Sequence, residues 1–486
     1  GSRAPQAAPS LQEARARIVP RLMKVGLVTL GCDKNTVDSE RYLAQLAAYG
    51  GEMTENLGDA EVIIVNTCGF IDAAKKESLD ALIEAGEYKT SGVCSTVVAV
   101  GCMVERHKGE LQEALPEVDL FLGASETDRL IEELASRGVL SGDPMLEHPG
   151  VRLYSGDLPH VRYLKVSEGC DHGCAFCAIP LMRGKHRSFA PEEVVAEAQL
   201  LEMQGAREIN LVAQDLAHYG RDIRDRTVRL PDVLQMLVHQ TTIPWIRMLY
   251  LYATGITPQL LELVAREPRI MPYIDMPIQH ASDTVLERMR RPERARTIRA
   301  NVARFRAAVP RVAIRTTCIV GFPGETEGDF EQLLGFLEDV QFERVGVFSY
   351  SPQEGTRAAE LDDDVPESVK RDRLERVSDL QRMITAERYE SRLGTPVQAL
   401  VDRIDDDTGL AVARLPWQAD DIDGVTFLDE RYTPGTLLEV VPREVVDDYD
   451  FSAETIRVIS APVGDIQTSL RRQLPLVSTT IGSFGR

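Results

Sequence analysis

Short apolar runs that alternate with polar, helix-favouring stretches are the feature that most constrains the fold of this 486-residue chain. In the first third, the apolar runs stand at Lys24–Leu30, Val62–Val65 and Thr96–Val100, and the stretch Asp72–Ile83 has the polar composition that separates them. Strands that alternate with helices form parallel sheets whose faces the helices cover. We therefore predict a doubly wound α/β domain over residues 23–150.

A cysteine follows each of these three apolar runs, at Cys32, Cys68 and Cys102, with intervals of 36 and 34 residues. Both intervals fit one strand–helix repeat of ~30 residues or more. Because open α/β sheets bind ligands at the carboxyl ends of their strands, the three thiols could converge and hold three irons of a 4Fe–4S cluster. Alternatively, they are three unrelated small buried side chains. The shared strand-end position favours the convergent site.

A second set of cysteines, Cys170, Cys174 and Cys177, has the spacing C-x3-C-x2-C, with Phe176 just before the last. Three thiolates can hold three irons of a 4Fe–4S cluster and leave the fourth iron open. A zinc site is the alternative, but zinc usually takes four ligands, often from two C-x2-C pairs. The spacing and the aromatic residue resemble the radical S-adenosylmethionine (SAM) superfamily. That resemblance implies that the open iron binds SAM and that one electron cleaves it to a 5′-deoxyadenosyl radical.

Strand and helix patterns alternate again over residues 155–365. Six strands without a clear seventh indicate a partial β/α barrel, whose functional residues gather at the carboxyl ends of the strands. Cys170 follows the first strand, which puts the second cysteine set at that end of the barrel. The candidate strands are Val161–Val166, Glu208–Ala213, Ile246–Leu251, Tyr273–Met276, Val312–Val320 and Arg344–Ser349.

Further candidate binding residues lie near these strand ends. Gly321 and Gly324 follow the fifth strand, where glycine permits close approach to a flat cofactor, and the superfamily resemblance implies that they and Phe176 border the adenine of SAM. Gln214 ends the second strand and either contacts a ligand or supports a residue that does. Arg183 could hold the SAM carboxylate or an acidic substrate side chain, or belong to a solvated basic loop.

The remaining segments have simpler predictions. Residues 366–394 show helical spacing and predict a connecting helix, and short β runs separated by turn residues predict a small β-barrel over residues 395–461. Residues 1–22 and 462–486 read as a flexible N-terminal extension and a flexible tail. Because no apolar run approaches the ~20 residues that span a bilayer and no signal peptide is recognisable, we expect a cytoplasmic protein.

This order of domains resembles the radical-SAM methylthiotransferase family, with a TRAM-like β-barrel at the C-terminal end. The family resemblance implies two 4Fe–4S clusters, an auxiliary one on Cys32, Cys68 and Cys102 that carries sulfur and a radical-SAM one on the second cysteine set. It also implies that one SAM donates a methyl group and another makes the radical. An external electron donor and a sulfur donor are implied as partners.

Two branches of the family differ in substrate. The MiaB-type branch modifies an adenosine in tRNA, and the RimO-type branch modifies the β-carbon of an aspartate in ribosomal protein twelve (uS12) of the small subunit. The segments Leu30–Glu40, Asn66–Leu79 and Asp421–Gly424 resemble the RimO-type branch. Asp33 departs from the proline that is usual there.

Charge gives a separate argument about the partner. The chain carries a net charge of −21, and residues 397–459 contain 15 acidic residues against 5 arginines and no lysine. Phosphate binding needs basic residues, so tRNA is disfavoured, whereas a basic ribosomal protein, free or in the ribosomal particle, would be attracted. We expect acids such as Asp420, Asp421 and Asp423 to take part, although acidity for solubility alone is the alternative. A tRNA adenosine methylthiotransferase and an iron–sulfur carrier without radical chemistry remain as alternative functions.

Overall fold

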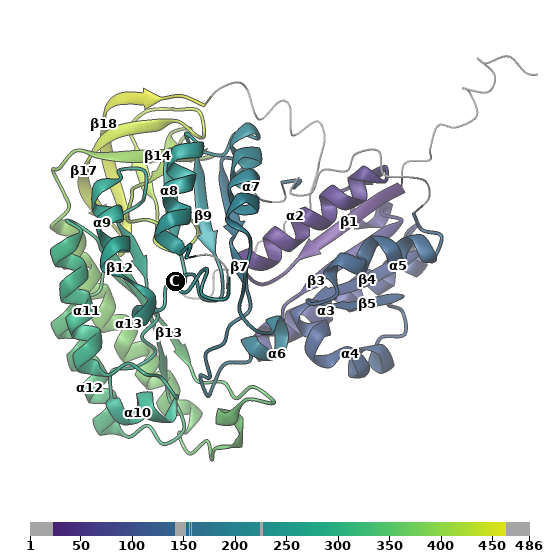
Figure 1. The fold of residues 1–486 in the computed structure, drawn as a ribbon, viewed down its shortest axis with the longest axis horizontal. Helices are drawn as coiled ribbons and strands as arrows, with labels where there is room; N and C mark the ends of the chain where they lie inside the picture. The colour runs from purple at the N-terminus through teal and green to yellow at the C-terminus, as the bar shows by residue number, and fades with distance from the viewer. Residues whose placement is uncertain (1–22, 141–151, 155, 157, 224–226, 463–486) are drawn as a thin grey trace, which may run out of the picture.

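The computed structural model describes residues 23–140, 152–154, 156, 158–223 and 227–462, arranged as three domains along the chain (Figure 1). The predicted N-terminal extension, and all of the predicted tail except Pro462, lie outside the described residues.

The N-terminal domain is a five-stranded sheet in the order β2-β1-β3-β4-β5, with every pair of strands parallel. One apolar core packs α2 and α5 on one face of the sheet, and another packs α3 and α4 on the opposite face. This arrangement confirms the doubly wound α/β fold. The elements are β1 Met23–Thr29, α2 Asp33–Ala48, β2 Gly51–Met53, β3 Val62–Thr67, α3 Asp72–Ser91, β4 Thr96–Gly101, α4 Cys102–Ala114, β5 Leu120–Gly123 and α5 Leu130–Ser136.

Two edge strands of this sheet, β2 and β5, were not predicted from the sequence. They have three and four residues, and each pairs with one neighbour only. Runs this short carry too little periodicity to be recognised. The three central strands are longer, and β3 and β4 are buried along their whole length. Burial on both faces of a parallel sheet therefore explains why these runs read as continuously apolar.

The second domain is a partial barrel of six parallel strands, as predicted. Two three-stranded sheets, β10-β9-β6 and β11-β12-β13, are joined through the bridge between Ile246 and Ile270. Helices cover the outside, and one large apolar core fills the space between them and the strands. The strands are β6 Val161–Lys165, β9 Glu208–Val212, β10 Trp245–Met248, β11 Tyr273–Asp275, β12 Ala313–Val320 and β13 Arg344–Ser349. The longer outer helices are α7 Pro191–Met203, α8 Leu230–Gln240, α9 Pro258–Arg266, α11 Ala295–Ala308 and α12 Glu327–Val340.

Short elements occupy the carboxyl ends of the barrel strands. The ribbon of β7 Ser167–Glu168 and β8 Arg187–Ser188 encloses the second cysteine set and α6 Ile179–Arg183. Helix α10, Asp283–Arg288, follows the fourth strand.

The long helix α13, Glu367–Glu390, leads to a closed barrel in the order β14-β15-β16-β18-β17. The sequence missed two of its strands, because β15 has only four residues and the second half of β18 is largely exposed. Trp245 and Tyr273 of the partial β/α barrel share an apolar core with this domain. The strands are β14 Val397–Ile404, β15 Ala411–Arg414, β16 Thr426–Leu428, β17 Leu437–Val446 and β18 Asp450–Ser460.

Two of the acids expected to bind a partner have structural positions instead. Asp423 is fully buried and accepts hydrogen bonds from the Tyr273 hydroxyl at 2.5 Å and the Ala419 amide at 3.0 Å. Asp420 accepts a hydrogen bond from the Tyr163 hydroxyl at 3.3 Å. Both carboxyl groups therefore join the β-barrel to the partial β/α barrel, and only Asp421 of the three is exposed. The sequence could not distinguish these positions because all three lie in one acidic run.

The N-terminal domain packs against the partial β/α barrel through polar and apolar contacts. Lys165 of β6 pairs with Asp38 of α2 at 2.5 Å, and Arg162 of the same strand pairs with Glu40 at 3.1 Å. Ala178 and Met182, at α6, pack directly on Cys102 at the start of α4. Consequently α6 lies between the two domains (Figure 1). Within the part of the chain that the structure describes, no helix has the length and apolar character needed to cross a bilayer.

Candidate active site

The first three cysteines lie at the carboxyl ends of three adjacent strands. Cys32 precedes α2, Cys68 follows β3, and Cys102 is the first residue of α4. Gly31 has φ +93°, and a Cβ added there would lie 2.8 Å from the Cys68 Sγ atom. The loops that carry Cys32 and Cys68 therefore touch, and only glycine fits at their contact.

The Asn35 side chain connects these two loops through hydrogen bonds. Its fully buried side-chain amide donates to the carbonyl of Leu30 at 2.7 Å and to the carbonyl of Thr67 at 3.2 Å. Each carbonyl lies within two residues of a cysteine, so the amide fixes the separation of the two strand ends.

The electrostatics of this site disfavour free thiolates. Burial and, to a smaller extent, the neighbouring cysteines raise the pKa of Cys68 to about 11 and that of Cys102 to about 12, while the Arg183 guanidinium acts in the opposite direction on both. A metal ligand must be a deprotonated thiolate, so binding couples proton release to neutralisation of the buried charge. Three cysteines at adjacent strand ends match the three thiolate ligands that a 4Fe–4S cluster with one open iron requires.

The second set of cysteines is held by one continuous loop after β7. The loop is fixed by backbone hydrogen bonds from the Cys170 amide to the Gly184 carbonyl at 3.1 Å and from the Ala175 amide to the Met289 carbonyl at 2.9 Å. Burial raises the pKa of Cys170 to about 11 and that of Cys177 to about 12, and Cys174 raises both. This set therefore also fits a cluster that neutralises three thiolates.

Arg291 is a further residue at this second set that sequence reasoning missed. Its side chain is almost fully buried, and its Nη1 atom lies 3.8 Å from the Sγ atom of Cys174. The guanidinium also lies over the Tyr252 ring, 4.1 Å from the ring centroid. The residue lies in a basic run after α10 that carries no recognisable motif, so no signal in the sequence singled it out.

The predicted adenine-binding residues come together in the fold. Phe176 packs against the apolar group that contains Phe322, which stands between Gly321 and Gly324 in the loop after β12. Both glycines have positive φ, +71° and +75°. A Cβ on Gly321 would lie 2.3 Å from Lys370, and one on Gly324 would lie 2.1 Å from Arg288. Backbone conformation and packing therefore require glycine at both positions, whether or not a cofactor binds there.

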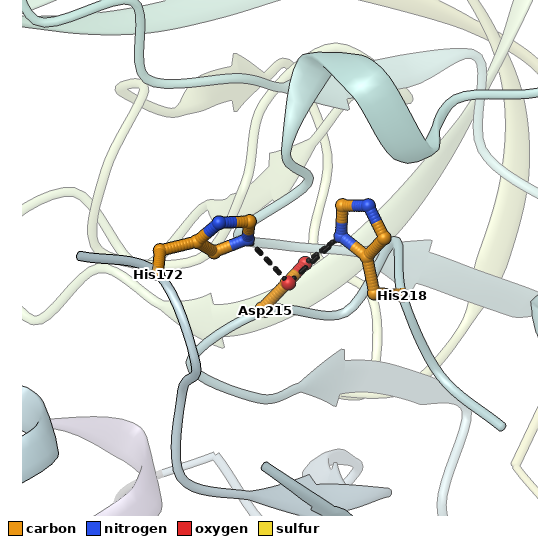
Figure 2. Close-up of side chains that lie close together, drawn as sticks. All are labelled: His172, Asp215 and His218. Carbon is orange, nitrogen blue, oxygen red and sulfur yellow. Dashed lines mark hydrogen bonds and ion pairs between the residues drawn. The ribbon is translucent and has the colours of Figure 1, made fainter. Parts of the chain in front are cut away.

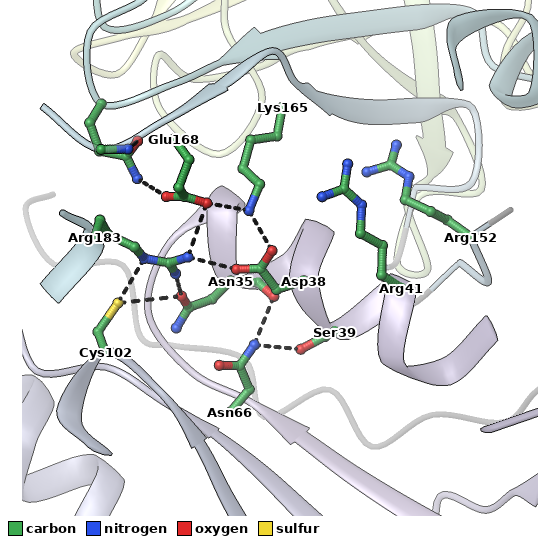
Figure 3. Close-up of polar contacts among 12 residues, drawn as sticks. Asn35, Asp38, Ser39, Arg41, Asn66, Cys102, Arg152, Lys165, Glu168 and Arg183 are labelled. Carbon is green, nitrogen blue, oxygen red and sulfur yellow. Dashed lines mark hydrogen bonds and ion pairs between the residues drawn. The ribbon is translucent and has the colours of Figure 1, made fainter. Parts of the chain in front are cut away.

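Gln214 and Arg183 both donate hydrogen bonds to Glu168, and Figure 3 shows Arg183 beside Glu168. The Gln214 side chain accepts a hydrogen bond from the Gly169 amide at 2.9 Å and donates one to Glu168 at 2.7 Å. Gln214 thus supports the residues beside Cys170.

Arg183 lies between the two cysteine sets and is not part of a solvated basic loop. Its Nε atom donates to the Cys102 Sγ atom at 3.1 Å, and its Nη1 atom donates to Asp38 at 2.8 Å. Because its nitrogens already have partners in the N-terminal domain, this geometry does not favour the expected role of holding the SAM carboxylate.

Asp33, which replaces the usual proline, has a clear contact. It accepts a hydrogen bond from the Tyr250 hydroxyl at 3.2 Å, and the Lys34 ammonium lies 3.0 Å from the centroid of the Tyr250 ring. Tyr250 has φ +62°, so it follows β10 in a strained conformation. The departure at Asp33 thus joins the first cysteine loop to the radical-SAM barrel.

Two histidines and one aspartate form a compact group beside the second cysteine set, and the sequence did not predict it as a unit. His172 and His218 each lie 2.8 Å from the Asp215 carboxylate (Figure 2), and their ligand atoms are within 4.8 Å of one another. Burial opposes ionisation of Asp215, but the hydrogen bonds from both histidines outweigh it and lower its pKa. Tyr252 stacks on His172 with ring centroids 3.8 Å apart. Because the histidines and the carboxylate satisfy one another, the group explains how the cysteine loop is anchored to β9 without a further metal.

Comparisons with known proteins agree with this arrangement. Residues 24–123 match the uncharacterized protein family UPF0004, and residues 164–337 match the radical SAM superfamily. The solved structure of TsrM, a radical SAM methyltransferase from Kitasatospora setae, aligns with a TM-score of 0.51 at 14% identity over 67% of this chain and 72% of that one. This structural likeness supports the fold, and the superfamily match gives the chain SAM and an iron–sulfur cluster as cofactors.

Curated relatives extend the comparison to nearly the whole chain. A ribosomal protein uS12 methylthiotransferase RimO from Anaeromyxobacter sp. (strain Fw109-5) is 42% identical over 93% of this chain and 99% of its own length. The protein of the same name from Myxococcus xanthus (strain DK1622) is 42% identical over 90% of this chain and 92% of its own length. With both cysteine sets inside the matched regions, the chain is an enzyme and belongs to the RimO family of radical-SAM methylthiotransferases.

Proposed function

We propose that this enzyme transfers a methylthio group to the β-carbon of an aspartate in ribosomal protein uS12, in the cytoplasm, and that it holds two 4Fe–4S clusters. The observation that carries the proposal is the pair of three-thiol sites at the strand ends of two domains that pack on each other through α6. The names of the curated relatives supply the substrate.

The two proposed clusters have different roles in the reaction. When bound, the cluster on the second cysteine set and SAM supply a radical that removes hydrogen, and the cluster on the first set supplies sulfur. A hydrogen on the β-carbon of aspartate is only weakly acidic, so an acid–base mechanism would be slow and a radical is suited to its removal.

The chain's own residues position these groups. The Cys170 loop is fixed by backbone hydrogen bonds and by the anchor from His172 to Asp215. Asn35 holds the strand ends that carry Cys32 and Cys68 at a fixed separation. These contacts orient the sites before a substrate arrives, which lowers the entropic cost of bringing the reacting atoms together.

The β-barrel is the candidate recognition surface for uS12. Asp423 and Asp420 are used inside the protein, so the surface acids lie elsewhere, mainly at the turns between strands. An acidic surface attracts a basic protein and repels the phosphates of tRNA. The exposed turn acids are Asp406, Asp407, Asp421, Asp429, Glu430, Asp447 and Asp448.

Product analysis tests the function directly. The enzyme is reconstituted anaerobically and incubated with SAM, sulfide, a reductant and either uS12 or tRNA, and both possible products are examined by mass spectrometry. We expect methylthiolated aspartate in uS12 and unmodified tRNA. Methylthiolated adenosine with unmodified uS12 would show the tRNA activity instead, and absence of SAM cleavage would leave only an iron–sulfur carrier.

A charge-reversal experiment tests the recognition surface. Changing Asp406, Asp407 and Asp447 to lysine should weaken uS12 binding and reduce its dependence on salt. The matched control changes Glu84, Glu87 and Glu113 to lysine, because these exposed acids in the N-terminal domain give the same change in net charge. Equal losses of binding in both triple variants would show that net charge, and not the β-barrel, governs the encounter.

A further inference from the structure

Arg183 is a charged residue of the radical-SAM domain that reaches the first cysteine set. It ends α6, five residues after Ala178, and its side chain is 5% exposed. Its Nε atom lies 3.1 Å from the Cys102 Sγ atom, and its Nη2 atom donates to the Asn35 side chain at 2.5 Å. Arg183 therefore contacts both a candidate cluster ligand and the amide that fixes the strand ends.

Two carboxylates hold the Arg183 guanidinium in place. Asp38 accepts from Nη1 at 2.8 Å, and Glu168 accepts from the same atom at 3.4 Å. Lys165 pairs with both carboxylates, at 2.5 and 2.6 Å (Figure 3). Because these four side chains fix one another, the Nε–H group of Arg183 remains directed at the Cys102 sulfur.

The same network continues to the second cysteine set. Glu168 accepts from Gln214 at 2.7 Å, and Gln214 accepts from the Gly169 amide at 2.9 Å. Gly169 directly precedes Cys170 in the chain. A continuous series of hydrogen bonds thus runs from Cys102 through Arg183, Glu168 and Gln214 to the backbone beside Cys170.

We propose that Arg183 is a positioning residue that sets the reduction potential of the auxiliary cluster and fixes its place relative to the radical-SAM site. Hydrogen bonds to ligating sulfurs tune iron–sulfur potentials, and a cationic donor stabilises the more negative, reduced cluster. Removing the Nε–H···S contact therefore lowers the potential of the auxiliary cluster. This inference rests on the proposed function, since it needs a cluster on Cys32, Cys68 and Cys102.

The decisive variant is Arg183→Lys, which keeps a positive charge for Asp38 and Glu168 but removes the donor to sulfur. Both clusters are titrated anaerobically and followed by electron paramagnetic resonance, with the radical-SAM cluster of the same sample as an internal reference. We expect the ratio of reduced to oxidised auxiliary cluster at a given potential to fall at least tenfold, which is about 59 mV for a one-electron couple. We expect the radical-SAM cluster to stay within a few-fold of its wild-type ratio.

The matched control is Arg299→Lys, because Arg299 lies on α11 with an exposed ion pair to Asp339 at 3.1 Å and touches neither cysteine set. It should move neither potential. Equal shifts of both clusters in Arg183→Lys, or no shift in the auxiliary one, would overturn the proposal. A wild-type chain that holds only one cluster would instead refute the proposed function.

A second measurement needs no change at Arg183, so it applies even if Arg183→Lys does not fold. Cys170, Cys174 and Cys177 are changed to alanine in protein labelled with 15N-arginine, so that only the auxiliary cluster remains. Pulsed electron paramagnetic resonance of the reduced cluster should show a 15N coupling from the guanidinium. Absence of this coupling from a folded, cluster-loaded sample would overturn the proposal.

Discussion

The two cysteine sets are assembled in different ways. Cys170, Cys174 and Cys177 lie within one eight-residue segment, which backbone hydrogen bonds to Gly184 and Met289 hold in place. Cys32, Cys68 and Cys102 come from three strand ends that only the folded sheet brings together. The ligands of the loop site are therefore close together in the sequence, whereas those of the sheet site are brought together only by the packing of a whole domain, with Arg183 added from its neighbour. Changes in the surroundings should thus affect the sheet site more readily.

The largest expected effect separates the sites by activity. Changing Cys170, Cys174 and Cys177 to alanine should reduce reductive SAM cleavage to background, because the radical requires a cluster at this loop. Chromatographic measurement of 5′-deoxyadenosine checks the result. Cleavage retained at the wild-type rate would mean that the loop site does not hold the radical-SAM cluster.

Changing a cysteine of the sheet site should stop sulfur transfer and leave SAM cleavage. Cys68→Ala or Cys102→Ala should retain much of the SAM cleavage while stopping methylthiolation of uS12, because sulfur supply depends on the sheet site. The two products are measured in the same reaction by mass spectrometry. Full methylthiolation by these variants would show that the sheet site has no role in sulfur transfer.

A smaller and more selective loss of iron is expected when Gly31 is changed. Gly31→Ala should lower the iron bound at the sheet site while the loop site keeps its cluster, because the added Cβ would lie 2.7 Å from the Cys68 Cβ atom. The control is Gly138→Ala, since Gly138 also has a positive φ, +71°, but nothing lies within 4 Å of the added atom. Equal iron loss in both variants would attribute the effect to backbone strain and not to crowding of Cys68.

The smallest effect concerns a region outside both sites. Burial raises the pKa of Asp420 to about 8, against the attraction of Arg414. A carboxyl whose pKa is raised on folding contributes stability below the unfolded-state pKa, near 4, and loses it as the pH rises towards 8. Asp420→Asn should therefore be more stable than wild type at pH 8, by on the order of 2 kcal/mol, with the difference shrinking towards pH 4.

Thermal unfolding at both pH values measures this difference. Iron content at both cysteine sets should stay unchanged in Asp420→Asn, because the residue lies at the junction with the β-barrel. A difference between variant and wild type that is the same at pH 4 and pH 8 would contradict the raised pKa.

Features encoded in a short stretch of the sequence could be predicted, and features that depend on the packing of distant segments could not. Long, fully buried strands such as β3 and β4, and the spacing of the loop cysteines, are local signals and were recognised. The short strands β2 and β15 carry too few residues to show a pattern. The place of Arg183 beside Cys102 depends on how two domains pack, which no local spacing encodes.

The sequence also could not predict which acidic side chains are buried. Asp421 and Asp423 stand two residues apart in one acidic run, yet one is exposed and the other bonds Tyr273 inside the protein. The group of His172, Asp215 and His218 joins a loop to the end of β9 across 43 residues, so it too needed the fold. Strand-end position was the one non-local rule that the sequence allowed, and it pointed to Cys32, Cys68 and Cys102.

The central claim is that each chain holds two separate iron–sulfur clusters, and a count of iron and acid-labile sulfide after anaerobic reconstitution tests it most directly. We predict about eight irons in the wild-type chain and about four in each variant that lacks one complete cysteine set. About four irons in the wild-type chain, all lost when Cys170, Cys174 and Cys177 are replaced, would contradict the account.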